Sequence, residues 1–152
     1  MTRAAFGKVR EARIIDAIRR SDGFVPELSL VAELEGVVVG HVMLSYVELG
    51  DDSRRVLELG PMSVAPERQR RGIGSALVEE ALHRADARGE PLVLVLGHPT
   101  YYPRFGFRPA SELGIAPPDP GIRDEVFMAV RLRGDEPSLR GRVVLPPSFA
   151  AD

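Results

Sequence analysis

The chain has 152 residues, of which 44% are hydrophobic and 28% are charged, a composition typical of one globular domain and not of a disordered chain. The formal net charge of −2 argues against a protein that attracts nucleic acids or membranes with its whole surface. The absence of cysteine excludes disulfides, thiolate zinc sites and a cysteine nucleophile. The three histidines are not spaced as ligands, so we predict no metal site.

The first predicted elements are a helix and a β-hairpin. Residues 4–20 tolerate a helix, which a Ser-Asp-Gly sequence then ends. Residues 28–34 and 37–49 are rich in Val and Leu and are joined by a tight Glu-Gly turn, which is typical of a hairpin. No apolar run approaches the roughly 18 residues of a membrane helix, and the first residues lack the apolar stretch of a signal peptide. We therefore expect a cytoplasmic protein.

A strand, a loop, a helix and a second strand follow. A polar turn at residues 51–55 leads to a third strand over residues 56–64. Pro61 predicts an irregularity in that strand, because proline cannot donate to the ladder. After a basic loop, residues 72–88 carry an apolar face at helical spacing, and residues 92–96 form a short apolar run typical of a buried strand. Such a crossover predicts a parallel pair of strands.

The last third of the chain is richer in turns. Residues 97–106 form an aromatic turn region and residues 116–121 a proline-rich loop. Residues 125–132 are predicted to form a strand, and residues 143–145 a final one. We see no linker or repeat and predict a single domain over residues 1–152.

The segment with the clearest chemistry is residues 69–75 (QRRGIGS), between a predicted strand and a helix. The first turn of a helix has free N–H groups and partial positive charge, glycines allow close approach, and Arg70 and Arg71 add full charges. These features favour a phosphate or pyrophosphate site. The segment is not a P-loop, and Leu77 replaces the third glycine of the dinucleotide fingerprint. The alternative is that the glycines only shape a turn and the arginines are solvated.

These residues resemble the GNAT family of N-acetyltransferases. The acyl-CoA signature of that family, Gln/Arg-x-x-Gly-x-Gly/Ala after the fourth strand, is matched by residues 69–74 (QRRGIG). Residues 59–66 (LGPMSVAP) resemble the family's fourth strand and its exit, and residues 102–107 (YPRFGF) resemble its Tyr-x-x-x-Gly-Phe ending. The wider segment 97–107 (GHPTYYPRFGF) is similar to an uncharacterised bacterial branch of predicted acetyltransferases.

The resemblance implies an α/β domain of α+β type, with a mixed, mostly antiparallel sheet and helices on both faces. The chain opens at the middle of the family's first helix, so we expect the family's first strand to be missing. The implied co-substrate is acetyl-CoA, with the pyrophosphate on main-chain N–H groups and the pantetheine arm paired with the third predicted strand. The cofactor-binding residues are then Met62, Ser63, Val64, Gln69, Arg70, Arg71, Gly72, Ile73, Gly74 and Ser75.

Two side chains match the family's catalytic positions. Glu58 stands where many members carry a glutamate base, and Tyr102 where they carry the tyrosine that donates to the departing thiolate. The alternatives are a strand-surface carboxylate facing water for Glu58 and an aromatic core residue for Tyr102, with Tyr101 as the replacement acid. The N–H of Met62 would face the oxyanion. His98 could bind substrate, shuttle a proton or cap a turn.

The resemblance thus predicts an N-acetyltransferase that acts on a primary amine of a small molecule or peptide. The acceptor stays open among a protein N-terminus, a lysine, a polyamine and an aminoglycoside, and a homodimer stays open as the assembly. The alternative function is a non-catalytic acyl-CoA-binding or regulatory domain. A nucleic-acid binder using Arg68, Arg70 and Arg71 is disfavoured by the acidic net charge and the lack of interleaved aromatic residues.

Overall fold

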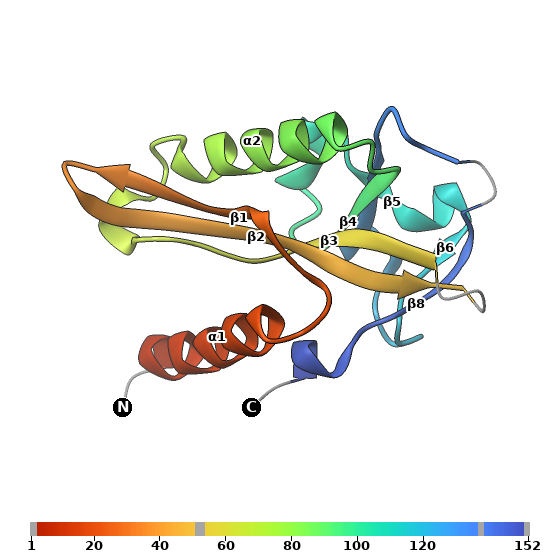
Figure 1. Cartoon of the computed structure of the whole chain (residues 1–152), viewed down its shortest axis with the longest axis horizontal. Coiled ribbons are helices and arrows are strands. Elements are labelled where there is room, and N and C mark those ends of the chain that lie inside the picture. The colour runs from red at the N-terminus through yellow and green to blue at the C-terminus, as the bar shows by residue number, and fades with distance from the viewer. Residues whose placement is uncertain (1–2, 51–53, 137–138, 151–152) are drawn as a thin grey trace.

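The computed structural model describes residues 3–50, 54–136 and 139–150, and these form a curved sheet with one long helix on each side (Figure 1). The two helices are α1 (Arg3–Arg19) and α2 (Ile73–Ala87). The strands are β1 (Phe24–Leu34), β2 (Val37–Leu49), β3 (Arg54–Val64), β4 (Leu92–Leu96), β5 (Arg108–Pro109), β6 (Ile115–Ala116), β7 (Phe127–Arg131) and β8 (Gly141–Val144). Short 3-10 turns connect them, among them η1 (Pro66–Arg68), η2 (Tyr102–Phe105) and η5 (Pro147–Ala150).

The predicted helices, hairpin and central strands are confirmed, with differences at their ends. β3 begins at Arg54, so Arg54 and Arg55 extend the strand and are not part of a polar turn; the rest of that predicted turn lies outside the described residues. The two-residue strands β5 and β6 lie in segments predicted to be loop or left unassigned. Such short strands have no periodicity to detect, because their pairing with β7 and β8 creates them.

The β1–β2 hairpin turns at Glu35 and Gly36, whose φ angles are 52° and 80°. Two successive positive φ angles are the backbone of a type I′ turn, which matches the twist of the flanking strands. Leu34 and Val37 pair directly at the end of the ladder. β2 then pairs with β3, so the hairpin continues into the centre of the sheet.

The crossover from β3 through α2 to β4 produces the predicted parallel pair, in which Leu57 is opposite Val93. The strand order is β5-β7-β4-β3-β2-β8-β6, with β1 paired to β2 off this path. Most neighbours are antiparallel, as in the pairing of β4 with β7. The sheet is therefore mixed and mostly antiparallel, as expected.

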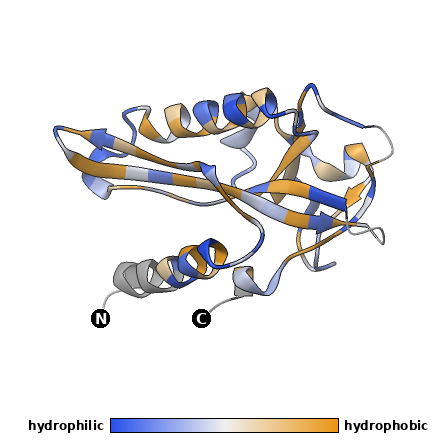
Figure 2. Cartoon of the chain, viewed as in Figure 1, coloured by the Kyte–Doolittle hydropathy of each residue, from blue (hydrophilic) through white to orange (hydrophobic). Residues whose placement is uncertain are grey.

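The core has one cluster on the α2 side of the sheet and a second around β7, β8 and the end of β2. On α2 the buried face consists of Leu77, Val78, Ala81 and Ala85. Figure 2 shows hydrophobic residues along the central strands and a mixture of hydrophilic and hydrophobic residues around α2. α1 lies on the other side of the sheet, where Ile18 is buried. Residues that alternate along a strand thus face either α2 or α1.

β3 is irregular at Pro61, as predicted. Val42 pairs with Met62 and Leu44 with Leu59, so two steps along β2 are opposite three steps along β3. This extra residue is a β-bulge. The parallel ladder with β4 ends at Leu59 and Val95, although β3 continues to Val64. β3 and β4 therefore diverge beyond these residues.

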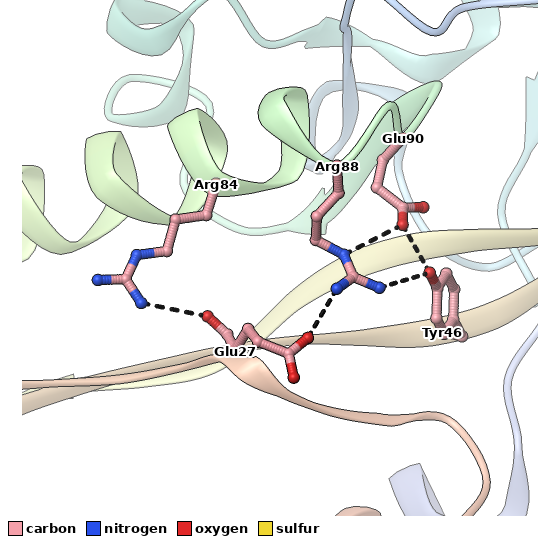
Figure 3. A network of polar contacts seen from close by, with 5 residues as sticks. All are labelled: Glu27, Tyr46, Arg84, Arg88 and Glu90. Atoms are coloured by element: carbon pink, nitrogen blue, oxygen red, sulfur yellow. Dashed lines mark hydrogen bonds and ion pairs between the residues drawn. The ribbon is translucent and has the colours of Figure 1, made fainter.

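A polar network fixes the C-terminal end of α2 to the hairpin (Figure 3). The hydroxyl of Tyr46 donates to Glu90 at 2.6 Å, and Arg88 donates to both Tyr46 and Glu27. Arg84 donates to the main-chain carbonyl of Glu27. These contacts join β1, β2 and α2, and so hold α2 in a defined position along the sheet.

Candidate active site

A groove of about 1130 Å³ opens where β3 and β4 diverge, bounded by the start of α2 and by η2. Its lining combines the end of β3, the basic loop and two adjacent tyrosines. The lining residues are Glu11, Met62, Ser63, Val64, Pro66, Arg68, Gln69, Arg70, Gly72, Gly74, Ser75, His98, Tyr101, Tyr102 and Arg104. The structure thus brings together two segments that lie about thirty residues apart in the chain, the predicted anion loop and the aromatic turn.

The start of α2 presents free main-chain donors to this groove. Gly72 is the N-cap with φ 82°, and being glycine it offers no capping side chain. The first helical bond of this turn runs from the N–H of Ala76 to the carbonyl of Gly72 at 2.9 Å. The N–H groups of Ile73, Gly74 and Ser75 therefore have no acceptor within the helix. Together with the helix dipole, they favour an anion at this position.

The loop before α2 has the backbone that such a site requires. Arg70 has a φ of 65°, which is unusual for a residue with a side chain. A Cβ on Gly72 would meet no atom within 4 Å, so the space in front of this residue is open to a ligand. A Cβ on Gly74 would lie 3.3 Å from the hydroxyl of Tyr101, so a larger residue there would press against the groove wall.

Not every predicted cofactor residue points into the groove. The side chain of Ile73 packs against the core, so this residue offers the groove only its main-chain N–H. Arg71 is exposed and does not line the groove. The side-chain amide of Gln69 donates to the carbonyl of Val64 at 3.1 Å. Gln69 therefore ties the loop to the end of β3, which is a structural contribution that the motif alone does not reveal.

Met62, Ser63 and Val64 line the groove from β3, beyond its last pair with β4. Main-chain groups of these residues that point away from β2 have no partner on β4. They form a free strand edge along the groove, to which an extended ligand could add main-chain hydrogen bonds.

Tyr102 is both a packed aromatic residue and part of the groove wall. It is 7% exposed, and its ring meets Phe107 edge-to-face at 5.6 Å between centroids. Gly97 makes room for it, because a Cβ there would lie 2.3 Å from the ring. Burial, followed by the neighbouring Tyr101, raises the pKa of Tyr102 to about 12. The phenol is therefore protonated at neutral pH and can donate a hydrogen bond.

Tyr101 contacts the anion loop directly. Its hydroxyl lies 3.2 Å from the hydroxyl of Ser75, at the first turn of α2. The guanidinium of Arg104 lies 4.6 Å from the centre of the Tyr101 ring, and its Nε donates to the Tyr101 carbonyl. Tyr101 and Arg104 therefore form a wall opposite the N–H groups of α2.

Glu58 is not in the groove. Its neighbours Leu57 and Leu59 belong to the cluster on the α2 side, so Glu58 faces the α1 side of the sheet. It is opposite Leu94 in the ladder, one residue before β3 and β4 diverge. Burial raises the pKa of Glu58 to about 8. The alternative of a carboxylate facing water is wrong, because only 7% of Glu58 is exposed.

Sequence reasoning gave no role in this groove to Glu11, Pro66 or Arg104. Glu11 comes from α1, and burial raises the pKa of its carboxyl while a hydrogen bond to Ser63 opposes that effect. Nothing in the local sequence indicates that α1 reaches this groove. Arg104 could have been found from its place two residues after Tyr102 on the same turn.

Two further properties concern the described residues as a group. They contain no cluster of three or more His, Asp or Glu side chains placed to hold a metal ion. Among these same residues, no helix combines the length and the apolar character needed to span a bilayer.

Comparison with known proteins gives consistent matches. A sequence profile described as "Acetyltransferase (GNAT) family" matches residues 3–107. The chain is 38% identical to the uncharacterized N-acetyltransferase YjhQ of Escherichia coli over 76% of this chain, and it spans 66% of that relative's length, slightly under two thirds. It is 32% identical to the uncharacterized N-acetyltransferase YhbS of E. coli over 89% of this chain and 80% of that protein.

Solved structures show the same fold with bound ligands. The crystal structure of E. coli YhbS, in complex with CoA, matches with a TM-score of 0.83 and 28% identity over 93% of this chain and 78% of that one. A GNAT family acetyltransferase from Brucella melitensis, in complex with acetyl-CoA, matches with a TM-score of 0.74 and 34% identity over 92% of this chain and 78% of that one.

Proposed function

The chain belongs to the acetyltransferase (GNAT) family, and from this premise we propose that it moves an acetyl group from acetyl-CoA to a primary amine by direct attack on the thioester. Membership makes it an acyl-CoA-dependent N-acyltransferase with acetyl-CoA as co-substrate. The observation that supports acyl-CoA binding is the row of free N–H groups at the start of α2, beside a free strand edge on β3. The buried Glu58 carboxyl, whose pKa is raised by burial, supports the transfer to an amine, because it can act as a general base.

The proposal for acetyl-CoA is supported by the groove of about 1130 Å³ that runs past the start of α2 and the end of β3. The N–H groups of residues 73–75 and the guanidinium of Arg70 would hold the pyrophosphate. The main chain of Met62, Ser63 and Val64 would pair with the pantetheine arm. Bound in this way, the co-substrate would supply an activated acetyl group on sulfur.

Glu58 is the proposed general base. A lysine-like amine has a pKa near 10.4, so only about one molecule in 2,500 is neutral at pH 7. Attack forms the nitrogen–carbon bond and breaks the carbon–sulfur bond, and the amine must lose a proton to the ionised form of Glu58, directly or through water. With a pKa of about 8, this ionised form predominates only above pH 8, so turnover is expected to rise with pH in this range. Because Glu58 faces the α1 side, the acceptor is expected to approach from that side, opposite α2.

Tyr102 is the proposed donor to the departing sulfur. With a tyrosine pKa of about 12 and a thiol pKa near 8.5, complete proton transfer to the thiolate would be uphill by about 5 kcal/mol. Tyr102 therefore acts by donating a hydrogen bond, which stabilises the sulfur while the carbon–sulfur bond breaks.

The test is turnover with defined amines. The full chain is incubated with acetyl-CoA and, separately, a lysine peptide, an alanine-terminated peptide, spermidine and kanamycin. Thiol release is followed with a chromogenic disulfide and the product by mass spectrometry. Equal amounts of free CoA and acetylated amine support the proposal. Thermal stabilisation by acetyl-CoA with no acetylated product from any amine would contradict it, and would favour the non-catalytic acyl-CoA-binding domain.

A further inference from the structure

Two buried polar side chains are opposite each other on the α1 side of the sheet. Ser45 on β2 is the direct ladder partner of Glu58 on β3. Ser45 is 1% exposed and Glu58 is 7% exposed. Directly opposed residues of antiparallel strands point to the same face, with Cβ atoms about 5 Å apart. The serine hydroxyl and the glutamate carboxyl are therefore neighbours within a closed environment.

Within the described residues neither group makes a hydrogen bond, to the other or to a third group. The Oγ of Ser45 is buried and makes no hydrogen bond within the described part of the chain. Within that same part no hydrogen bond or ion pair involves Glu58, and burial alone raises its pKa. A buried polar atom without a partner is rare and costly in folded proteins. A hydroxyl donor directly beside a carboxyl acceptor is the pair that satisfies both.

Among the described residues, the strands beside Glu58 place no charged side chain next to it. On β2 the next residues on this face are Met43 and Val47, and on β4 the partner of Glu58 is Leu94, all buried. The nearest ionisable side chain on this face of β2 is His41, four residues from Ser45, and burial lowers its pKa, with a smaller effect from the charge of Arg19 on α1.

Glu11, an acidic residue of α1, interacts with Ser63. Burial is the cause that raises the pKa of Glu58. Ser45 is thus the one polar side chain that the neighbouring strands place opposite Glu58 in the described residues.

We propose that Ser45 is a positioning residue for the general base, a proposal that rests on the proposed function of Glu58. The hydroxyl of Ser45 donates a hydrogen bond to the ionised carboxylate, and so holds it in one orientation and stabilises it. The proton of the acceptor amine passes to Glu58, directly or through water, whereas the Ser45 proton stays on Oγ. Ser45 therefore acts through Glu58 and does not touch the substrate.

The direct test is a carboxyl titration that needs no acceptor. The Glu58 carboxyl is followed by NMR in the full chain with ¹³C-labelled glutamate, and its signal is assigned as the one missing in Glu58→Gln. Ser45→Ala should raise the apparent pKa of Glu58 by roughly one, which is a tenfold gain in proton affinity. Ser45→Thr keeps the hydroxyl and should restore the wild-type value.

The matched control is Ser148, a second buried serine with an unpartnered Oγ, in η5. Ser148→Ala should leave the Glu58 titration unchanged. Equal titrations of Glu58 in wild type and Ser45→Ala would overturn the proposal, and so would equal effects of Ser45→Ala and Ser148→Ala.

The base role is tested separately, by the pH profile of kcat/KM with whichever amine of the panel is acetylated. If Glu58→Gln leaves that profile unchanged, the base assignment fails, and the proposal for Ser45 as its positioning residue fails with it. If kcat/KM increases with pH in wild type and Glu58→Gln removes this increase, the base assignment is supported. If Ser45→Ala then leaves the increase at the same pH as in wild type, only the proposal for Ser45 fails. A shift of the rise to higher pH in Ser45→Ala, reversed in Ser45→Thr, supports both.

Discussion

Replacing Glu58 with glutamine should change how the stability of the protein depends on pH. Burial raises the pKa of Glu58 from 4.5 to about 8 in the folded chain. Between these two values the folded state keeps a proton that the unfolded state has released. The stability contributed by this proton is complete below the unfolded pKa and is lost as the pH rises through the folded one.

The size of the effect follows from the two pKa values. Each pKa unit corresponds to 1.36 kcal/mol, so a rise from 4.5 to about 8 amounts to about 5 kcal/mol over the whole range. Between pH 5 and 7.5 the free energy of unfolding should fall by about 1.4 kcal/mol for each pH unit because of this group alone. Glutamine has the shape of the protonated acid but cannot titrate, so the variant lacks this slope.

The assay is urea unfolding of wild type and Glu58→Gln at intervals from pH 5 to pH 8.5. Subtracting the two curves removes the contributions of all other ionisable groups. Between pH 5 and 7.5 the difference in the free energy of unfolding should change by about 1.4 kcal/mol for each pH unit, which is the slope expected for one titrating proton. Glu48→Gln on β2, which removes an exposed carboxylate, serves as the matched control. Parallel curves for Glu58→Gln and wild type would refute the claim that the buried Glu58 carboxyl holds a proton in the folded state.

Other variants test the tyrosines and their support. Tyr102→Phe should lower kcat by about 10- to 100-fold in steady-state kinetics. Its affinity for acetyl-CoA, measured by calorimetry, should be nearly unchanged. An unchanged kcat would mean that Tyr102 only packs in the core. Gly97→Ala places a methyl group 2.3 Å from the Tyr102 ring. It should lower the free energy of unfolding in urea by about 1–3 kcal/mol and also slow turnover. An unchanged free energy of unfolding would mean that the ring is free to move. Tyr46→Phe removes the hydrogen bond to Glu90. It should lower the free energy of unfolding by roughly 1–2 kcal/mol without weakening acetyl-CoA binding. Weaker binding with unchanged stability would contradict the structural role of this network.

Much of the fold follows from local sequence. The apolar face of α2, the alternation and tight turn of the β1–β2 hairpin and the short apolar run of β4 each identify one element and its neighbours. Pro61 predicts the irregularity in β3, because the missing N–H makes a regular ladder impossible at that position.

Other features could not be read in this way. The exposure of Leu96 at the end of β4 was not expected from a continuous apolar run, and it arises because β3 has already turned away at that point. The approach of Glu11 to the groove and the opposition of Ser45 to Glu58 depend on the packing of α1 and on strand register. A single-residue change in register would turn Ser45 to the other face. The motif identifies the anion loop, but only the three-dimensional structure shows that Arg71 and the side chain of Ile73 are not part of the groove lining.

We propose that the main-chain N–H groups at the start of α2 hold the diphosphate of acetyl-CoA. This is tested by calorimetric titration of acetyl-CoA into the intact folded chain and two variants. Gly72→Glu places a carboxylate in the open space before α2. The control Ala87→Glu adds the same charge at the far end of the helix. We expect saturable binding to wild type and Ala87→Glu, and no binding to a folded Gly72→Glu. No binding to wild type, or equal affinity in all three proteins, would show that the start of α2 does not hold the diphosphate.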